Sequence, residues 1–245
     1  MDRKTARKLA HAEMEMRRSD EGSFLRQIIL GGQDGLVNVL GVLLGVASGT
    51  SDTGIVIIAG LAATFAESIS MAAVAYTSSK AEQDFYRKEF EREKREIREL
   101  PEVETEEIRL IYMKKGFRGS QLNSIVKKIT SDQKVWLQVM MQEELGLSES
   151  EKVNPLREGI VVGLAALAGS FVPLIPFFLL PLQSAVIASL AVSIMALFAM
   201  GAYKGKLTLG DWMRSGFEIA VIGMIAAIAG YAIGAAAGNA KLGTG

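Results

Sequence analysis

The chain alternates between long apolar stretches and polar stretches that are rich in charge. Five apolar segments can be marked, each of about 21 to 25 residues, which at 1.5 Å per residue suffices to cross a hydrocarbon core of about 30 Å. They cover residues 28–48, 54–78, 159–180, 182–203 and 215–237. This pattern predicts an all-α polytopic membrane protein with five transmembrane helices.

The polar stretch between the second and third apolar segments predicts a helical insert of about 75 residues. Residues 80–100 contain no proline or glycine, so they are expected to continue the second transmembrane helix until Pro101 interrupts it. Further helices are expected over residues 102–115, 120–129 and 132–145. The third and fourth apolar segments meet at Pro181 and are expected to form a tight hairpin.

Basic residues predict the orientation of the chain in a membrane. Seven precede the first apolar segment, 16 lie from Lys80 to Arg157 and three from Lys204 to Arg214, whereas the C-terminal tail has only Lys241. The positive-inside rule therefore places the N-terminus and the insert in the cytoplasm and the C-terminus outside. The predicted division is a cytoplasmic N-terminal segment, two transmembrane helices, a cytoplasmic helical domain, three transmembrane helices and a C-terminal tail, over residues 1–26, 27–78, 79–156, 157–238 and 239–245.

Composition excludes several classes of function. The 27 basic and 27 acidic residues cancel, and there is no isolated basic patch, which argues against nucleic-acid binding. There is no cysteine, so disulfides, thiolate metal sites and cysteine nucleophiles are excluded. The single histidine is His11, in the N-terminal segment, so the usual zinc triads and the Glu-x-x-His pairs of di-iron bundles are absent too. A metal ion would have to bind to carboxylate, carbonyl, water or thioether groups.

Two carboxylates lie inside the first two apolar segments, namely Asp34 and Glu67. A charged group at membrane depth costs about 3 kcal/mol or more, so such groups normally line a cavity or an ion path. The alternative is a protonated acid that hydrogen-bonds to a neighbouring helix. This alternative is less attractive for two acids in consecutive segments than for one.

Helix geometry gives approximate depths for these groups. If the first helix enters the membrane near Gln27, Asp34 lies about 10 Å below the cytoplasmic surface, and Met71 of the antiparallel second helix lies at a similar depth. Glu67 is four residues from Met71, on the same face and one turn deeper. These three residues are the candidate transport path, and additional polar contacts are expected from Gln33, Asn38, Ser68 and Ser70.

Glycines at four-residue spacing predict close helix packing in the first segment. They form two series, Gly31/Gly35 and Gly41/Gly45/Gly49. Such spacing suits packing within the chain and also a seam between two copies. Five helices make a thin wall around a pathway, so we expect a homodimer.

The insert carries acidic and methionine side chains at helical spacing. Two interpretations remain open from spacing alone: a metal site, or a solvated charged surface with i,i+4 ion pairs and methionines in the core. The residues concerned are Glu89, Glu93, Glu96, Glu104, Glu107, Met140, Met141 and Glu144.

At these positions the chain closely resembles the vacuolar iron transporter family, in a prokaryotic-type form. The matching stretches are GGQDGLVNVLGVLLGVASG in the first segment, ISMAAVAYTSSKAEQDFYRKEFEREKREI through the second segment and the long helix, PEVETEEIRLIYMKKGF and WLQVMMQEELGL in the insert, and FVPLIPFFLLP in the third segment. They follow one another in the family's order and with similar spacing.

The resemblance implies a dimer with five transmembrane helices per subunit and a cytoplasmic metal-binding domain. It implies a secondary transporter rather than an enzyme, without a prosthetic group, which exports Fe²⁺ in exchange for protons. Further candidate ions are Mn²⁺, Zn²⁺, Co²⁺ and Ni²⁺. The host membrane would be the plasma membrane in a prokaryote and the vacuolar membrane in a eukaryote.

The resemblance also implies roles for individual residues. Asp34 matches the family's first-helix aspartate, and Met71 matches the methionine of the second helix. Plant and fungal members carry a glutamate where this chain has Ala63, and Glu67 stands one turn from that position. The matched metal-binding positions of the insert are Glu93, Glu96, Glu104, Glu107, Met140, Met141 and Glu144, and Glu89 is an additional candidate.

The main functional hypothesis is thus a divalent-cation/proton antiporter with Glu67 as the proton carrier. A membrane-anchored metal sensor or scaffold would bind ions without transporting them. A passive channel would transport ions without responding to a pH gradient. A ferroxidase-like enzyme is disfavoured because the insert has no histidine.

Overall fold

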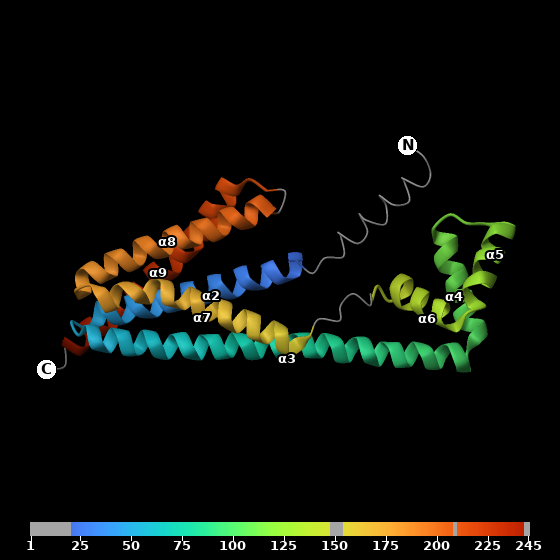
Figure 1. The fold of residues 1–245 in the computed structure, drawn as a ribbon, viewed down its shortest axis with the longest axis horizontal. Coiled ribbons are helices and arrows are strands. Elements are labelled where there is room, and N and C mark those ends of the chain that lie inside the picture. Colours follow the sequence, from blue (N-terminus) through green and yellow to red (C-terminus); the bar gives the residue numbers. More distant parts are fainter. Residues whose placement is uncertain (1–20, 148–153, 208–209, 243–245) are drawn as a thin grey trace. The chain divides into compact units, whose positions relative to one another are not determined.

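The computed structural model describes residues 21–147, 154–207 and 210–242 (Figure 1). His11 and the first 20 residues of the predicted N-terminal segment lie outside this part of the chain. The described residues form helices and no strand, which confirms the predicted all-α class. The chain divides into two compact units, a membrane unit of Met1–Tyr76 with Pro155–Gly245 and an insert unit of Thr77–Asn154, and the boundary falls inside one long helix.

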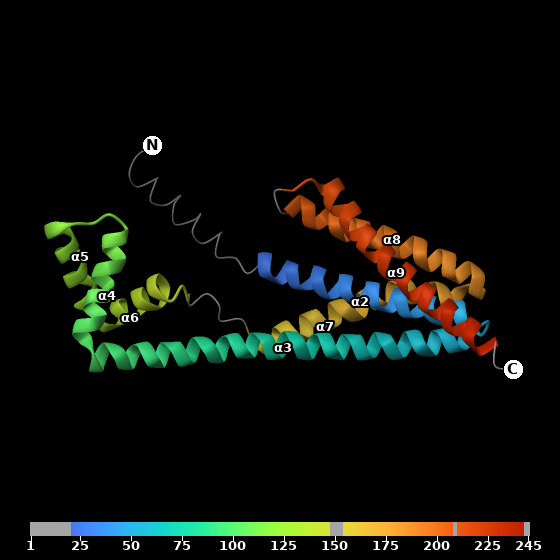
Figure 2. The same cartoon turned by 180° about the vertical axis from the view of Figure 1, so that it is seen from behind.

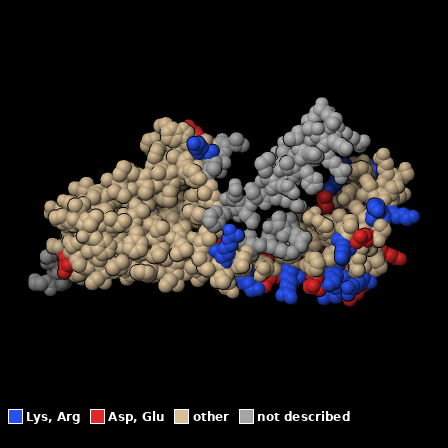
Figure 3. Space-filling model, in the orientation of Figure 1, with Lys and Arg blue, Asp and Glu red and all other residues tan. Residues whose placement is uncertain are grey.

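Five helices in the described residues are long and apolar enough to cross a membrane, as predicted. They are α2 (Glu21–Gly49), α3 (Thr53–Glu99), α7 (Pro155–Leu179), α8 (Leu182–Leu207) and α9 (Trp212–Leu242). The face of the membrane unit seen in Figure 3 is almost free of charged side chains, whereas Lys, Arg, Asp and Glu gather on the insert unit. Charge is thus segregated along the chain as the hydropathy pattern indicates.

Short polar connections set the starts of α3 and α9. Asp52 Oδ1 accepts a hydrogen bond from the Gly54 amide at 2.7 Å, and Asp211 Oδ1 accepts one from the Met213 amide at 2.9 Å. Each carboxylate satisfies an amide that would otherwise lack a partner in the first helical turn. Both helices therefore begin at residues that the sequence itself specifies.

Glycines let α2 approach two neighbouring helices closely, as both ribbon views suggest (Figures 1 and 2). A Cβ atom on Gly35 would collide with the Ala166 carbonyl of α7, and one on Gly45 would lie 2.9 Å from the Gly230 carbonyl of α9. Among the two arrangements left open by the sequence, the glycine series of α2 therefore serves packing within the chain. Close backbone contact is the main source of attraction between helices in lipid, where no hydrophobic force drives them together.

A buried apolar cluster joins four helices of the membrane unit. It contains Val39, Leu43, Val56, Leu174, Phe177 and Ala185 from α2, α3, α7 and α8. Gly60 makes room for this cluster, because a Cβ atom there would lie 2.6 Å from both Leu43 and Leu174. The membrane half of α3 is thereby held against α2 and α7.

The insert unit consists of the outer part of α3 followed by α4 (Pro101–Lys114), α5 (Gly119–Thr130), α6 (Gln133–Val139) and the π-helical turn η1 (Met140–Glu144). Pro101 occupies the first turn of α4, where its missing N–H costs nothing. Gly116 and Gly119 adopt φ values of 97° and 56° in the connection to α5, a conformation that favours glycine. The insert core contains Ile97, Ile108, Leu122, Val126, Ile129, Trp136, Leu137, Met140 and Met141.

The last helix of the insert differs from the expectation of one regular helix over residues 132–145. Its end winds more widely, and the Leu145 amide donates to the Met140 carbonyl at 3.2 Å, five residues back. Wide π turns of this kind are rare and occur frequently at functional sites. Both methionines of this turn, Met140 and Met141, are buried in the core of the insert.

The close contact of α2 with α9 generates a testable prediction. Gly230→Ala would place a Cβ atom against the Gly41 carbonyl and 2.9 Å from the Gly41 Cα atom, so we expect a loss of about 1 to 3 kcal/mol in stability. In the control, Gly41→Ala, the new Cβ lies 3.7 Å from the Ala226 carbonyl and should cost less than about 0.5 kcal/mol. Thermal unfolding in detergent measures both, and equal effects would contradict the packing of these helices.

Candidate functional site

The two acids of the membrane unit lie in contact. The side chain of Glu67 of α3 lies beside those of Asp34 and Asn38 of α2. Asp34 and Asn38 are four residues apart and therefore on one side of their helix. Among the described residues, neither carboxyl group has an ion-pair partner.

This contact corrects the expected depths. Helix arithmetic separated Asp34 from Glu67 by one turn, whereas the structure brings their carboxyl groups together. The estimate counted residues back from Ser78 as the end of the second transmembrane helix. However, α3 runs without a break to Glu99, so its register against α2 could not be obtained from the end of the apolar segment.

The other predicted residues of the membrane unit differ in burial and in their contact with the two acids. Met71 lies one turn after Glu67 on α3 and is partly buried, as is Gln33 on α2. Ser68 is buried, and its hydroxyl donates to the Thr64 carbonyl of its own helix at 2.6 Å. Ser70 is exposed. Only Asn38 of the four additional polar residues is seen in contact with the acids.

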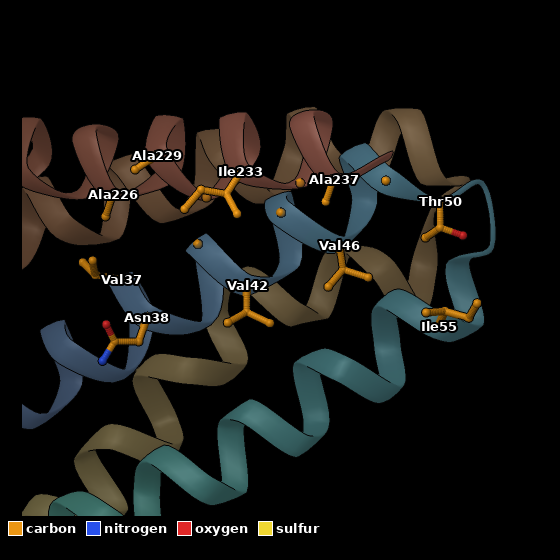
Figure 4. Close-up of a pocket in the computed structure, with 15 residues that line it drawn as sticks. Val37, Asn38, Val42, Val46, Thr50, Ile55, Ala226, Ala229, Ile233 and Ala237 are labelled. Atoms are coloured by element: carbon orange, nitrogen blue, oxygen red, sulfur yellow. The ribbon is translucent and has the colours of Figure 1, made fainter. Parts of the chain in front are cut away.

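A groove begins at Asn38 and follows α2 towards Thr50 (Figure 4). Its volume is about 880 Å³, and α9 forms its other wall. Its lining residues are Val37, Asn38, Gly41, Val42, Gly45, Val46, Gly49, Thr50, Ile55, Ala226, Ala229, Gly230, Ile233, Gly234 and Ala237. Except for Asn38 and Thr50 these side chains are apolar, so the groove runs from Asn38 to the far end of α2 along a largely apolar surface.

In the insert unit, three carboxyl groups converge. Glu93 of α3, Glu104 of α4 and Glu144 of η1 each offer an oxygen atom, and these atoms lie within 4.8 Å of one another. Glu93 is 1% exposed and Glu104 is 4% exposed. The buried atoms Glu93 Oε1 and Glu104 Oε2 have no hydrogen-bond partner. Unpaired buried oxygens are costly, so this cluster is poised to accept a proton or a cation.

Burial and mutual repulsion raise the pKa of these three groups. Burial, the hydrogen bond with Glu104 and the nearby negative charges raise the pKa of Glu93 to about 8. The pKa of Glu104 is also raised, chiefly by burial, although the hydrogen bond with Glu93 opposes this. Burial, together with the charges of Glu107 and Glu104, raises the pKa of Glu144 to about 7. Without a metal ion, the cluster therefore retains protons near neutral pH.

The remaining predicted acids surround this cluster. Glu96 and Glu107 are partly buried, and the charge of each raises the pKa of Glu104 after burial, the largest cause. Glu89 is buried and pairs with Arg92, whose Nη1 atom lies 2.8 Å from its carboxylate. Sequence reasoning missed Arg92. It lies three residues after Glu89 and four residues before Glu96, and this spacing places all three on the same side of the helix.

The two methionines belong to the core of the insert. Met140 is 0% and Met141 is 2% exposed, and both pack in the cluster that contains Ile97 and Ile108. Ile97 follows Glu96 in the sequence, and Ile108 follows Glu107. The part of the core that contains the methionines is therefore adjacent to these acids. Their burial matches the core interpretation, and the same π turn carries Glu144.

The donor set suits a divalent cation of intermediate hardness. Oxygen ligands around such an ion, with bonds of about 2.1 Å, lie at most about 4.2 Å apart, which is comparable with the 4.8 Å within which these three oxygens lie. Small side-chain rotations would complete such a site. Carboxylates with a neighbouring thioether fit Fe²⁺ or Mn²⁺ better than Cu⁺, which prefers sulfur alone.

The raised pKa values predict how the ion-free insert responds to pH. A carboxyl group with a higher pKa in the folded state stabilises the fold fully below its unfolded pKa, and this stabilisation is lost as pH rises towards the folded pKa. Melting temperature should therefore fall by at least about 5 °C between pH 5 and pH 8, the shift that about 1 kcal/mol produces in a small domain. Fluorescence of Trp136 in a Trp212→Phe protein with a chelator measures this.

The control for that prediction is the double variant Glu93→Gln/Glu144→Gln. Glutamine keeps the size of a protonated glutamate and does not ionise, so the fall in melting temperature should shrink. A wild-type insert that became more stable from pH 5 to pH 8 would contradict the raised pKa values.

Comparison with known proteins identifies the family of the chain. The family model described as VIT family matches residues 25–235. Vacuolar iron transporter 1 of Arabidopsis thaliana is 34% identical over 213 residues, which are 86% of this chain and 85% of the relative. Vacuolar iron transporter 2 of Oryza sativa is 34% identical, with 86% of both chains covered, and the vacuolar iron transporter of Toxoplasma gondii is 31% identical over 93% of this chain and 79% of its own. The chain is therefore an integral membrane protein that belongs to the VIT family of transporters.

Proposed function

We propose that this protein exports Fe²⁺ from the cytoplasm in exchange for protons, with Mn²⁺, Zn²⁺, Co²⁺ and Ni²⁺ as further candidate ions. The observation that carries the proposal is the contact between Asp34 and Glu67 in the membrane unit. Two carboxyl groups without a cationic partner at membrane depth are costly, which supports a role in moving ions. The relatives named vacuolar iron transporters support iron as the ion.

The acid pair supplies a simple coupling chemistry. Metal binding requires ionised carboxylates, whereas two neighbouring carboxyl groups without a metal ion favour protonation of one of them. Metal and protons would therefore compete for the same oxygens, and protonation from the acidic side would release the ion. Glu67, which lies beside both Asp34 and Asn38, is the proposed proton carrier, and Met71 one turn away is the proposed soft ligand.

The insert unit is proposed to gather ions in the cytoplasm. The supporting observation is the convergence of Glu93, Glu104 and Glu144 with two unpartnered buried oxygens. Glu96 and Glu107 are proposed to complete the coordination, with Met140 and Met141 beside them. The predominance of basic residues on the N-terminal segment and the insert supports the cytoplasmic placement, with the C-terminus outside.

The proposal includes a homodimer in which a second copy covers the groove along α2. Val42 lines this groove and is 39% exposed. The groove starts at Asn38, beside the acid pair, so a second copy would enclose the ions that move along it. Five helices from one chain leave this face open.

Transport measurements test the proposed path. In proteoliposomes with an imposed pH gradient, Asp34→Ala and Glu67→Gln should each lower Fe²⁺ flux at least about tenfold, a loss of about 1.4 kcal/mol or more in the barrier. Glu67→Gln should also remove the response to the gradient, since the glutamine side chain does not ionise. The control is Asp52→Asn, which alters an exposed acid and retains the oxygen that caps α3.

Unchanged, gradient-driven flux in Glu67→Gln would remove Glu67 from the mechanism. Wild-type protein that binds Fe²⁺ without flux would favour a sensor or scaffold. Flux that ignores the pH gradient would favour a passive channel.

Cross-linking tests the homodimer, because the natural chain has no cysteine. Val42→Cys, with its side chain in the groove, should give a covalent dimer with a short bifunctional maleimide in membranes. Ile187→Cys on α8, where the native side chain is 70% exposed, is the control and should remain monomeric. A monomer for Val42→Cys, or equal cross-linking of both variants, would contradict a second copy at the groove.

A further inference from the structure

Arg92 is a cation inside an otherwise acidic stripe of α3. Its Nη1 atom lies 2.8 Å from a carboxylate oxygen of Glu89, and its Nε atom lies 3.4 Å from one of Glu96. Glu89 is 8% exposed in its side chain, whereas Arg92 and Glu96 are 40% and 35% exposed. The guanidinium therefore bridges two acids at the edge of the cluster formed by Glu93, Glu104 and Glu144.

The bridge to Glu96 is incomplete. Arg92 Nε is buried and has no hydrogen-bond partner, because the 3.4 Å approach to Glu96 lacks hydrogen-bond geometry. The bond to Glu89 is shorter, and it joins residues that are three apart on the helix. Glu96 is thus the more easily detached of the two acids, and it stands next to the convergent carboxylates.

The charge of Arg92 reaches the other two helices of the insert. At Glu104 and Glu144, burial and neighbouring carboxylates raise the pKa, and Arg92 partly offsets this rise at both positions. The Arg92 side chain is 40% exposed, yet its Nε atom is buried, and its charge lies close enough to the carboxylates of α4 and η1 to act on them. A divalent ion bound between these acids would lie within the same field and be repelled by it.

We propose that Arg92 is an internal cation that competes with the metal ion for Glu96 and so weakens the affinity of the insert. In the ion-free insert, Arg92 holds Glu96 and balances part of the negative charge. When a divalent ion binds, Glu96 exchanges the guanidinium for the metal, and Arg92 keeps only Glu89. This inference rests on the proposed metal-gathering role of the insert and adds a device that promotes release.

Such a device suits a transporter. A cluster of several carboxylates without a nearby cation would bind a divalent ion tightly and release it slowly. A guanidinium that cannot lose its proton supplies a permanent competitor, which does not depend on pH. The insert would then deliver ions instead of storing them.

The test uses full-length protein in detergent with Mn²⁺ as the probe. Calorimetry gives the dissociation constant, and mixing with a chelator gives the rate of release; Glu104→Gln identifies the signal that belongs to the insert. Arg92→Gln should bind Mn²⁺ about tenfold more tightly and release it correspondingly more slowly, since a nearby positive charge is removed. Arg92→Lys keeps the positive charge, so its dissociation constant for Mn²⁺ should lie within about threefold of the wild-type value. If Arg92 acted only through the shape of its guanidinium group, lysine could not replace it in this way.

The matched control is Arg95→Gln, which removes an equal charge from an exposed position on the same helix and should change the affinity less than about twofold. Arg92→Met, which retains the apolar stem, serves if Arg92→Gln does not fold. Unchanged or weaker binding in folded Arg92→Gln or Arg92→Met, the two variants that remove the charge, would overturn the inference while leaving the metal site intact. If Glu104→Gln left the Mn²⁺ binding of the protein unchanged, both the metal-gathering role of the insert and this inference would be overturned.

Discussion

Close backbone packing around α2 is the constraint on which the membrane unit depends. Lipid offers helices no hydrophobic reason to associate, so contact must come from surfaces that fit closely. Gly35 meets the carbonyl of Ala166 on α7, and Gly45 meets that of Gly230 on α9, at separations that leave no space for a Cβ atom. With two of its sides occupied in this way, α2 presents Asp34 and Asn38 to Glu67 of α3.

Both candidate sites use the same electrostatic arrangement. In each, carboxyl groups lie against other carboxyl groups instead of against basic residues: Asp34 with Glu67 in the membrane unit, and Glu93 with Glu104 in the insert unit. Such pairs cannot all be ionised in a poorly hydrated environment without an added cation. A proton and a metal ion would therefore compete for both sites, which is the physical basis of the proposed exchange.

The two sites differ in how they manage negative charge. Arg92 pairs with Glu89 and Glu96 in the insert, whereas the acid pair of the membrane unit has no ion-pair partner in the described residues. The neutral Asn38 lies beside that pair instead. The proposed gathering site thus has a built-in competitor for the metal ion, and the proposed transport site has none.

Sequence reasoning was strongest where a property depends on near neighbours. The apolar segments predicted α2, α3, α7, α8 and α9, because hydropathy over about 20 residues is enough to specify a membrane-spanning helix. Pro101 predicted the break after α3, and helical spacing brought Glu93 and Glu96 together. The motifs also predicted the family, since a resemblance needs only order and spacing.

The sequence by itself thus determined the helices, the segregation of charge and the acids that are available for chemistry. Only the tertiary structure decided which acids meet. The uninterrupted course of α3 concealed its register against α2, and so hid the contact between Asp34 and Glu67. The π turn at Met140 likewise emerged only in the structure, as did the proximity of Arg92 to Glu104 and Glu144, whereas its pairing with Glu89 and Glu96 follows local helical spacing.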